Sequence, residues 1–140
     1  MNSLFVETSG WASLFIPTEL FHPKALQVFQ IARHQRYQIV TTNYIIAELV
    51  SLLDSRMRAP RSQLFQYVDV IRNDADLNVD HIDSAIDAAA WMLCKTRPDK
   101  NWSLVDCTSF VVMQQLGIQQ AMTTDQHFEQ AGFLRLLKPE

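Results

Sequence analysis

Short apolar runs alternate with longer stretches of helical periodicity along this chain. Runs of this length, bounded by polar residues, predict buried strands at 4–6, 38–41, 77–79 and 120–123, and residues 134–137 are a candidate fifth strand. Because strands alternate with helices, we expect an α/β fold, a three-layer sandwich with a mostly parallel central sheet.

The helices are predicted between these runs, where apolar residues recur every three or four positions. Ser9 is a candidate cap for a short helix that Pro17 ends, and Ser103 is a candidate cap for a helix closed by Gly117. Further helical stripes cover about 25–32, 45–53, 64–71 and 82–93, and a short helix follows Asp125.

Composition narrows the classes of function. The 140 residues fit one domain, 1–140, and only 3 glycines are present, so a glycine-rich phosphate loop is excluded. The formal net charge of −3 counts against strong non-specific affinity for nucleic acid. That argument weakens if bound cations cover some of the acids, because they change the local field.

The cysteines and the hydropathy indicate a soluble cytoplasmic protein. Cys94 and Cys107 lack the spacing and the histidine partners of a zinc site, so we interpret them as core thiols in a reducing compartment. No apolar run approaches the ~18 residues of a membrane span, and the N-terminus lacks the basic region of a signal peptide. We therefore expect no membrane partner.

Four acidic residues stand where a parallel sheet usually binds its ligand. Glu7 directly follows the first predicted strand, and Asp125 follows the fourth. Ligands of such sheets bind outside the carboxyl ends of the strands. Glu48 shares a helix face with apolar side chains such as Leu52, where an ionised carboxylate needs a partner, and Asp106 lies in the first turn of a later helix.

Each acid also has an interpretation that requires no site. Ser103 and Asp106 have the spacing of a capping box, and Asp125 after two threonines is a natural helix cap. Glu7 is compatible with an ordinary loop acid, and Glu48 with a partner of a nearby arginine. Taken together, however, carboxylates in one pocket repel one another, and a divalent cation removes that repulsion. Oxygen ligands suit Mg2+ or Mn2+, and two such ions can activate water and stabilise the leaving oxygen of a phosphodiester.

Four segments resemble the acidic motifs of PIN domains. The segment 4–11 resembles the family's opening strand, 41–48 its second motif, 99–110 its third and 123–133 its fourth. The resemblance covers nearly the whole chain. It implies a parallel sheet sandwiched by helices and an RNA-cleaving activity that depends on Mg2+ or Mn2+.

The resemblance also assigns roles to residues and implies partners. It implies that four acids bind metal and catalyse the reaction and that two residues assist them: Glu7, Glu48, Asp106 and Asp125 as the acids, and Ser9 and Asp99 as auxiliary groups. Many small bacterial members are VapC-type toxins held inactive by a cognate antitoxin. A single-domain chain fits that branch, with RNA as substrate, an antitoxin as partner and a homodimer as one possible assembly.

One position departs from the family's pattern. Glu7 stands where the family usually has aspartate. The extra methylene can displace the carboxylate by about 1 Å, a change that can lower a rate about a hundredfold. Glu7 therefore leaves open an alternative function, a catalytically weak PIN-like module that binds antitoxin or RNA. From the sequence alone we predict that Glu7→Asp raises activity. A deoxyribonuclease is a third possibility, which the low basic charge disfavours.

The remaining candidates have ordinary structural interpretations. His127 could contact RNA, but a surface or helix-packing role is the commoner one. Two basic clusters are compatible with phosphate or antitoxin contacts, although solvated helix ends are the commoner explanation: Arg33, His34 and Arg36, and Arg56, Arg58 and Arg61. Three tryptophans stand in apolar contexts and are predicted to be core anchors: Trp11, Trp91 and Trp102.

Overall fold

A computed structural model describes residues 2–140 of the chain and places five parallel strands in one sheet. The strand order is β3-β2-β1-β4-β5. Each strand lies where the apolar pattern predicts it, although the last is shorter: β1 Ser3–Val6, β2 Gln38–Thr42, β3 Leu77–Asp80, β4 Gln120–Met122 and β5 Leu134–Arg135. The predicted parallel sheet is therefore confirmed.

The central strand, β1, carries the most buried part of the sheet. Phe5 pairs with Val40 of β2 on one side and with Ala121 of β4 on the other. All three side chains are fully buried. A strand covered on both faces reads as a continuous apolar run rather than an alternating one, which explains the pattern at residues 4–6.

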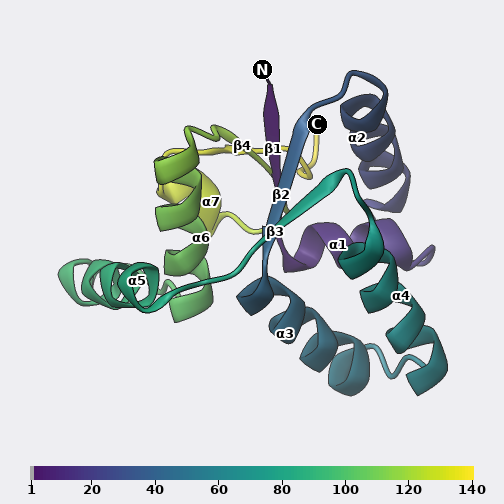
Figure 1. Cartoon of the computed structure of the whole chain (residues 1–140), viewed down its shortest axis with the longest axis horizontal. Coiled ribbons are helices and arrows are strands. Elements are labelled where there is room, and N and C mark those ends of the chain that lie inside the picture. Colours follow the sequence, from purple (N-terminus) through teal and green to yellow (C-terminus); the bar gives the residue numbers. More distant parts are fainter. Residues whose placement is uncertain (1) are drawn as a thin grey trace.

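Helices cover both faces of the sheet. Figure 1 shows α1, α2 and α4 on one side and α5, α6 and α7 on the other, which confirms the three-layer sandwich. The helices are α1 Thr8–Phe15, α2 His22–His34, α3 Asn43–Ser51, α4 Arg61–Asn73, α5 Ser84–Thr96, α6 Leu104–Leu116 and α7 His127–Gln130. A π-helical turn, η1 (Leu52–Arg56), continues α3.

The helix caps agree with the sequence in one case and correct it in another. Ser103 and Asp106 form a capping box at the start of α6, and Gly117 ends that helix in the left-handed conformation with φ 68°. The cap of α1, by contrast, is Glu7, whose side chain accepts a hydrogen bond from the backbone N–H of Ser9. Ser9 is thus the second residue of the helix and not its cap, because the Glu7 side chain reaches forward to the N–H of Ser9.

The tryptophans divide between core and surface. Trp11 is fully buried, and its Nε1–H donates to Thr41 Oγ1 at 3.1 Å. A buried indole usually satisfies its N–H in this way, so the predicted core position is confirmed. Trp102 is half-buried and packs edge-on against Phe110. The prediction for Trp91 is wrong, because its side chain is 54% exposed on α5. Apolar neighbours in the sequence do not reveal which face of α5 packs against α6 and which face is exposed to solvent.

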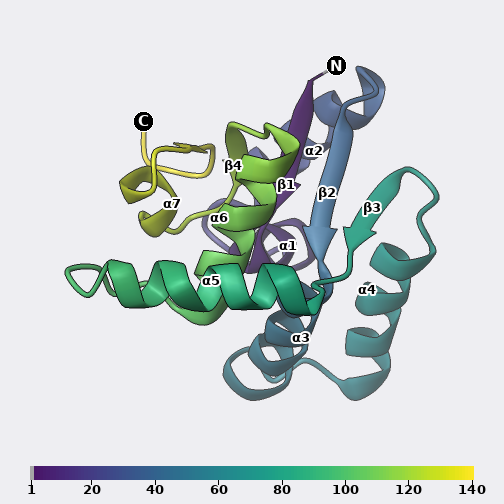
Figure 2. The same ribbon diagram turned by 60° about the vertical axis from the view of Figure 1, so that its left-hand side comes forward.

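The two cysteines lie between α5 and α6, which pack against each other in both ribbon views (Figure 2). Cys107 is buried, Cys94 is partly buried, and their Sγ atoms are 3.0 Å apart as free thiols. Burial raises the pKa of the Cys107 thiol to about 12, which keeps it protonated and unreactive. The interpretation as a core thiol is confirmed for Cys107, whereas Cys94 is only partly buried and packs against the same cluster. None of the helices within residues 2–140 has the length and apolarity to cross a membrane.

Candidate active site

Elements that begin at the carboxyl edge of the sheet supply all four predicted acids. Glu7 stands between β1 and α1, and Asp125 follows β4. Glu48 comes from α3, which starts directly after β2, and Asp106 comes from the first turn of α6. The negative charges act on one another: Glu48 raises the pKa of Glu7, while Asp106 and Asp125 raise that of Glu48. The structure therefore brings the four acids together.

Glu7 is the most buried member of the cluster, with 6% of its surface exposed. Its Oε1 accepts hydrogen bonds from the backbone N–H of Ser9 at 3.0 Å, from Ser9 Oγ at 2.5 Å and from Thr123 Oγ1 at 2.6 Å. Burial raises the pKa of Glu7 to about 7, and these hydrogen bonds oppose that rise without cancelling it. Ser9 and Thr123 therefore hold one oxygen of Glu7 in place.

Glu48 lies between Glu7 and the two aspartates. Thr8 Oγ1 donates to its Oε1, which turns the carboxylate toward the start of α1. Burial is the main cause that raises the pKa of Glu48, and the hydrogen bond from Thr8 counteracts it. Its half-buried position follows from the helix face that it shares with Ile45 and Leu52, as the sequence predicts.

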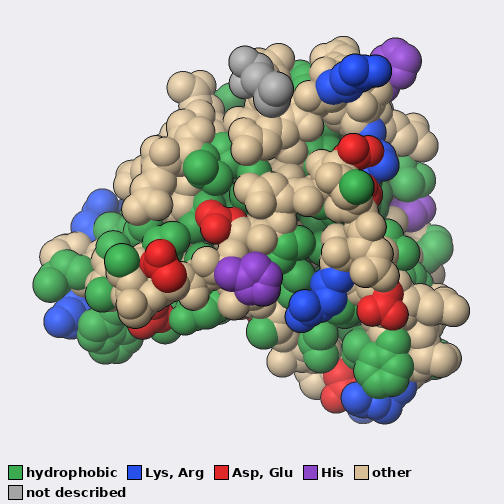
Figure 3. All heavy atoms as spheres, in the orientation of Figure 1, with side chains coloured by type: hydrophobic (Ala, Val, Ile, Leu, Met, Phe, Trp, Pro, Cys, Tyr) green, Lys and Arg blue, Asp and Glu red, His purple; other side chains and the backbone are tan. Residues whose placement is uncertain are grey.

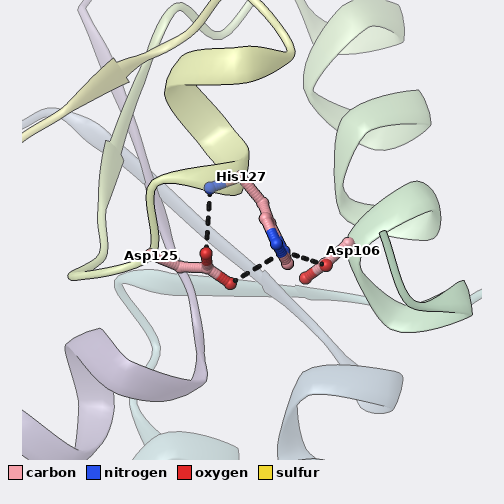
Figure 4. Close-up of side chains that lie close together, drawn as sticks. All are labelled: Asp106, Asp125 and His127. Carbon is pink, nitrogen blue, oxygen red and sulfur yellow. Dashed lines mark hydrogen bonds and ion pairs between the residues drawn. The ribbon is translucent and has the colours of Figure 1, made fainter. Parts of the chain in front are cut away.

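Asp106, Asp125 and His127 converge at the other end of the cluster (Figure 4). Asp106 Oδ2 accepts from the backbone N–H of Ser103 at 3.1 Å and lies 2.9 Å from His127 Nδ1. Asp125 Oδ1 accepts from the backbone N–H of His127 at 2.9 Å, and its Oδ2 is 3.4 Å from the same Nδ1. Burial raises the pKa of Asp106 despite these donors. His127 is thus neither a surface nor a simple packing histidine.

The sequence offers only one signal for His127, its place two residues after Asp125. An aspartate oxygen that accepts from the N–H two residues on forms an Asx turn, and that turn brings the histidine ring to the same side as the carboxylate. The second partner, Asp106, is 21 residues away in the chain, so only the packing of α6 against α7 brings it to the ring.

The donor set fits a hard divalent cation. One oxygen each from Asp106 and Asp125 and one ring nitrogen of His127 all lie within 4.8 Å of one another. Burial and mutual repulsion raise the pKa values of Glu7, Glu48 and Asp106, so ionising all of them without a cation is unfavourable. A cation with oxygen ligands relieves that repulsion.

Asp99, predicted as an auxiliary group, is not brought into this cluster. Its carboxylate is 59% exposed and accepts from Arg97 at 3.1 and 3.0 Å. The hydrogen bond from Arg97 lowers the pKa of Asp99, and the other charges that act on it are those of Arg97 and Lys100. Asp99 is the first residue of the third motif in the sequence, but in the structure its side chain faces solvent.

A cleft of about 380 Å³ leads away from the two glutamates. Its walls carry two carboxylates, four hydroxyls and one guanidinium: Glu7, Thr8, Ser9, Glu48, Ser51, Leu52, Ser55 and Arg56 line it. Two of the other basic residues form ion pairs elsewhere, since Arg33 pairs with Asp74 at 2.5 Å and Arg61 pairs with Asp54 at 3.3 Å. Of the two predicted basic clusters, Arg56 is therefore the member that borders the site.

A parallel sheet with acidic side chains at its carboxyl edge, two of them grouped with a histidine, is typical of α/β domains that bind divalent cations. The chain belongs to the PIN-domain family, whose family model matches residues 4–134. The predicted family and the predicted ribonuclease class are thereby confirmed.

Two further comparisons place the chain within the family. It is 30% identical over 139 residues to the 23S rRNA-specific endonuclease VapC20 of Mycobacterium tuberculosis, covering 98% of this chain and 99% of that protein. The crystal structure of VapC20, described as a sarcin–ricin loop cleaving toxin, superposes with a TM-score of 0.82 at 29% identity, over 96% and 99% of the chains. FitAcB from Neisseria gonorrhoeae shares the fold, with a TM-score of 0.64 at 13% identity over 94% of each chain.

Proposed function

We propose that this chain is a divalent-metal-dependent endoribonuclease and the toxin of a toxin–antitoxin pair. The observation that carries the proposal is the convergence of Glu7, Glu48, Asp106 and Asp125 at the edge where the family has its acids. Similarity to VapC20 over nearly the full length of both chains supports the same conclusion.

Mg2+ or Mn2+ would be held by carboxylate oxygens of Glu48, Asp106 and Asp125, with Glu7 behind them. When bound, such an ion supplies an activated water and stabilises the charge that develops on the phosphate. The chain prepares its carboxylates in advance: Thr8 orients Glu48, and the N–H of Ser103 orients Asp106. Ligands fixed in this way lose little freedom when the cation arrives.

RNA would enter along the cleft beside the glutamates. The hydroxyl of Ser51 can bond to a sugar or a phosphate, Ser55 Oγ can accept from a sugar hydroxyl, and Arg56 can pair with a neighbouring phosphate. Figure 3 shows that Lys and Arg side chains on the face shown are scattered rather than gathered in one patch. Recognition would therefore depend on the shape of a folded RNA more than on general attraction to phosphate.

The relatives indicate which RNA to test first. VapC20 acts on 23S rRNA, so we propose a loop of the large ribosomal RNA as the substrate and the cytoplasm as the place of action. A cognate antitoxin would hold the enzyme inactive until it is removed. Homodimerisation is a further proposal, and sedimentation of the purified chain tests it.

The alternative of a catalytically weak module rests on Glu7. Its Oε1 is occupied by donors from Ser9 and Thr123, so this oxygen is a structural acceptor as much as a ligand. A module that binds RNA or antitoxin without cutting it would not use the other three acids for catalysis. The experiment below distinguishes this module from a ribonuclease.

Cleavage of a 23S rRNA fragment, an unstructured RNA and single-stranded DNA, each with Mn2+, Mg2+ or chelator, tests the proposal. We expect metal-dependent cleavage of the rRNA fragment. Asp106→Asn should abolish it while keeping α6 capped, because the amide oxygen of asparagine can still accept from Ser103. The matched control is Asp76→Asn, an acid 79% exposed and remote from the cluster in its pair with Arg33, which should keep full activity.

The outcomes separate the alternatives. If Asp106→Asn retains the rate, Asp106 is only a helix cap. If the unaltered chain binds the rRNA fragment without cutting it under any of these conditions, the chain is the weak module. Cleavage of DNA in preference to RNA would make it a deoxyribonuclease.

A further inference from the structure

His127 stands in the acid cluster in the position of a ligand. Its ring points between Asp106 and Asp125, with Nδ1 at 2.9 Å from one Oδ2 and 3.4 Å from the other (Figure 4). Neighbouring ligands of an octahedral ion with bonds of ~2.1 Å lie about 3.0 Å apart. The two distances from Nδ1 are therefore close to this spacing, and the two carboxylate oxygens lie within 4.8 Å of each other.

The position of the ring is fixed from two sides. The backbone N–H of His127 donates to Asp125 Oδ1, and this hydrogen bond holds both residues in one turn at the start of α7. Asp106 is held from α6 by the capping box with Ser103. The imidazole is 24% exposed and the two carboxylates 11% and 31%, so an ion from solvent can reach all three donors.

We propose that His127 Nδ1 is a direct ligand of the catalytic cation and that this nitrogen makes the site select Mn2+ over Mg2+. The inference rests on the proposed function for the existence of the metal site, and it adds a nitrogen to a set of carboxylate oxygens. Mg2+ strongly prefers oxygen, whereas imidazole suits transition-metal ions. A nitrogen at this position thus sets which ion the enzyme uses.

A competing role for His127 is that of a counter-charge. A protonated ring would pair with both carboxylates and would compete with a cation instead of binding it. The two roles predict opposite effects of removing the ring. Loss of a ligand weakens Mn2+ binding, whereas loss of a counter-charge leaves Mn2+ binding unchanged or strengthens it.

The test compares His127→Gln with the unaltered chain and with His34→Gln, a control at the exposed end of α2. The Kd of Mn2+ is measured from the electron paramagnetic resonance signal of the free ion, and that of Mg2+ by competition. We expect His127→Gln to weaken Mn2+ binding about tenfold or more and Mg2+ binding less than about threefold. Pulsed spectra of bound Mn2+ should show coupling to an imidazole nitrogen, present with His34→Gln and lost with His127→Gln.

The inference is overturned if bound Mn2+ shows no nitrogen coupling, if Mn2+ does not bind, or if His127→Gln binds Mn2+ as tightly as the unaltered chain. Cleavage of RNA is scored separately. Metal-dependent cleavage without nitrogen coupling leaves the proposed function standing and refutes the ligand role. Nitrogen coupling without cleavage of any RNA supports the ligand role and refutes the ribonuclease.

Discussion

Glu7→Gln is expected to stabilise the metal-free protein at neutral and higher pH. Glu7 is buried, and its Oε1 accepts from Ser9 and Thr123 in the manner of a carbonyl oxygen. Glutamine presents the same acceptor without a charge, so it imitates the protonated glutamate. The substitution therefore removes the unfavourable ionisation and keeps the hydrogen bonds.

The size and sign of the effect follow from the pKa. Burial raises the pKa of Glu7 from its ordinary 4.5 to about 7 in the folded chain. The folded state then holds a proton that the unfolded state releases, so the free energy of unfolding falls as pH rises from about 4.5 to about 7. A rise of this size corresponds to about 3 kcal/mol lost above the folded pKa. Below pH 4.5 Glu7 is protonated in both the folded and the unfolded state, so this loss of stability is absent.

Urea unfolding in the presence of chelator, from pH 4.5 to 8.5, measures this difference. Near the low end the variant and the unaltered chain should differ by less than about 1 kcal/mol. At the high end Glu7→Gln should be the more stable by about 3 kcal/mol. Asp106, whose pKa is also raised, contributes a common slope to both proteins, and the comparison removes it.

Parallel curves for the two proteins over the whole range would refute the reasoning, because they would mean that Glu7 ionises in the folded chain as freely as in the unfolded one. Addition of Mn2+ gives a second check. A bound cation favours ionised carboxylates, so saturating Mn2+ should narrow the advantage of Glu7→Gln at high pH.

Three other substitutions have defined outcomes. The structure reverses the sequence-based expectation for Glu7→Asp: the shorter arm draws away from Thr123 Oγ1, so we expect single-turnover RNA cleavage to slow by up to about a hundredfold, and a faster rate would mean that the pocket suits aspartate better. Gly10→Ala should destabilise the fold by about 3 kcal/mol or more in urea unfolding, because its Cβ would lie 2.1 Å from the backbone oxygen of Met122. Gly117→Ala, which meets no atom within 4 Å but has φ +68°, should cost only about 1 kcal/mol, and an equal loss for both glycines would contradict the steric explanation.

Local sequence determined the elements and both ends of α6. The apolar run at 4–6 forms the central strand, and every side chain in it is buried. An unbroken apolar run is the pattern expected of a strand that is covered on both faces. Ser103, Asp106 and Gly117 begin and end α6 through contacts within a few residues of one another. The acids after β1 and β4 were predictable because the carboxyl ends of parallel strands share one edge.

Tertiary structure decided the features that depend on distant segments. The charge state of Glu7 depends on Thr123, 116 residues away, and on burial that no local pattern measures. The exposure of Trp91 depends on which face of α5 meets α6. His127 becomes part of the site only when α6 brings Asp106 to its ring. Hydrogen bonds within a turn are encoded by neighbours in sequence, whereas burial and contacts between charges arise only when the sheet and its two layers of helices have packed.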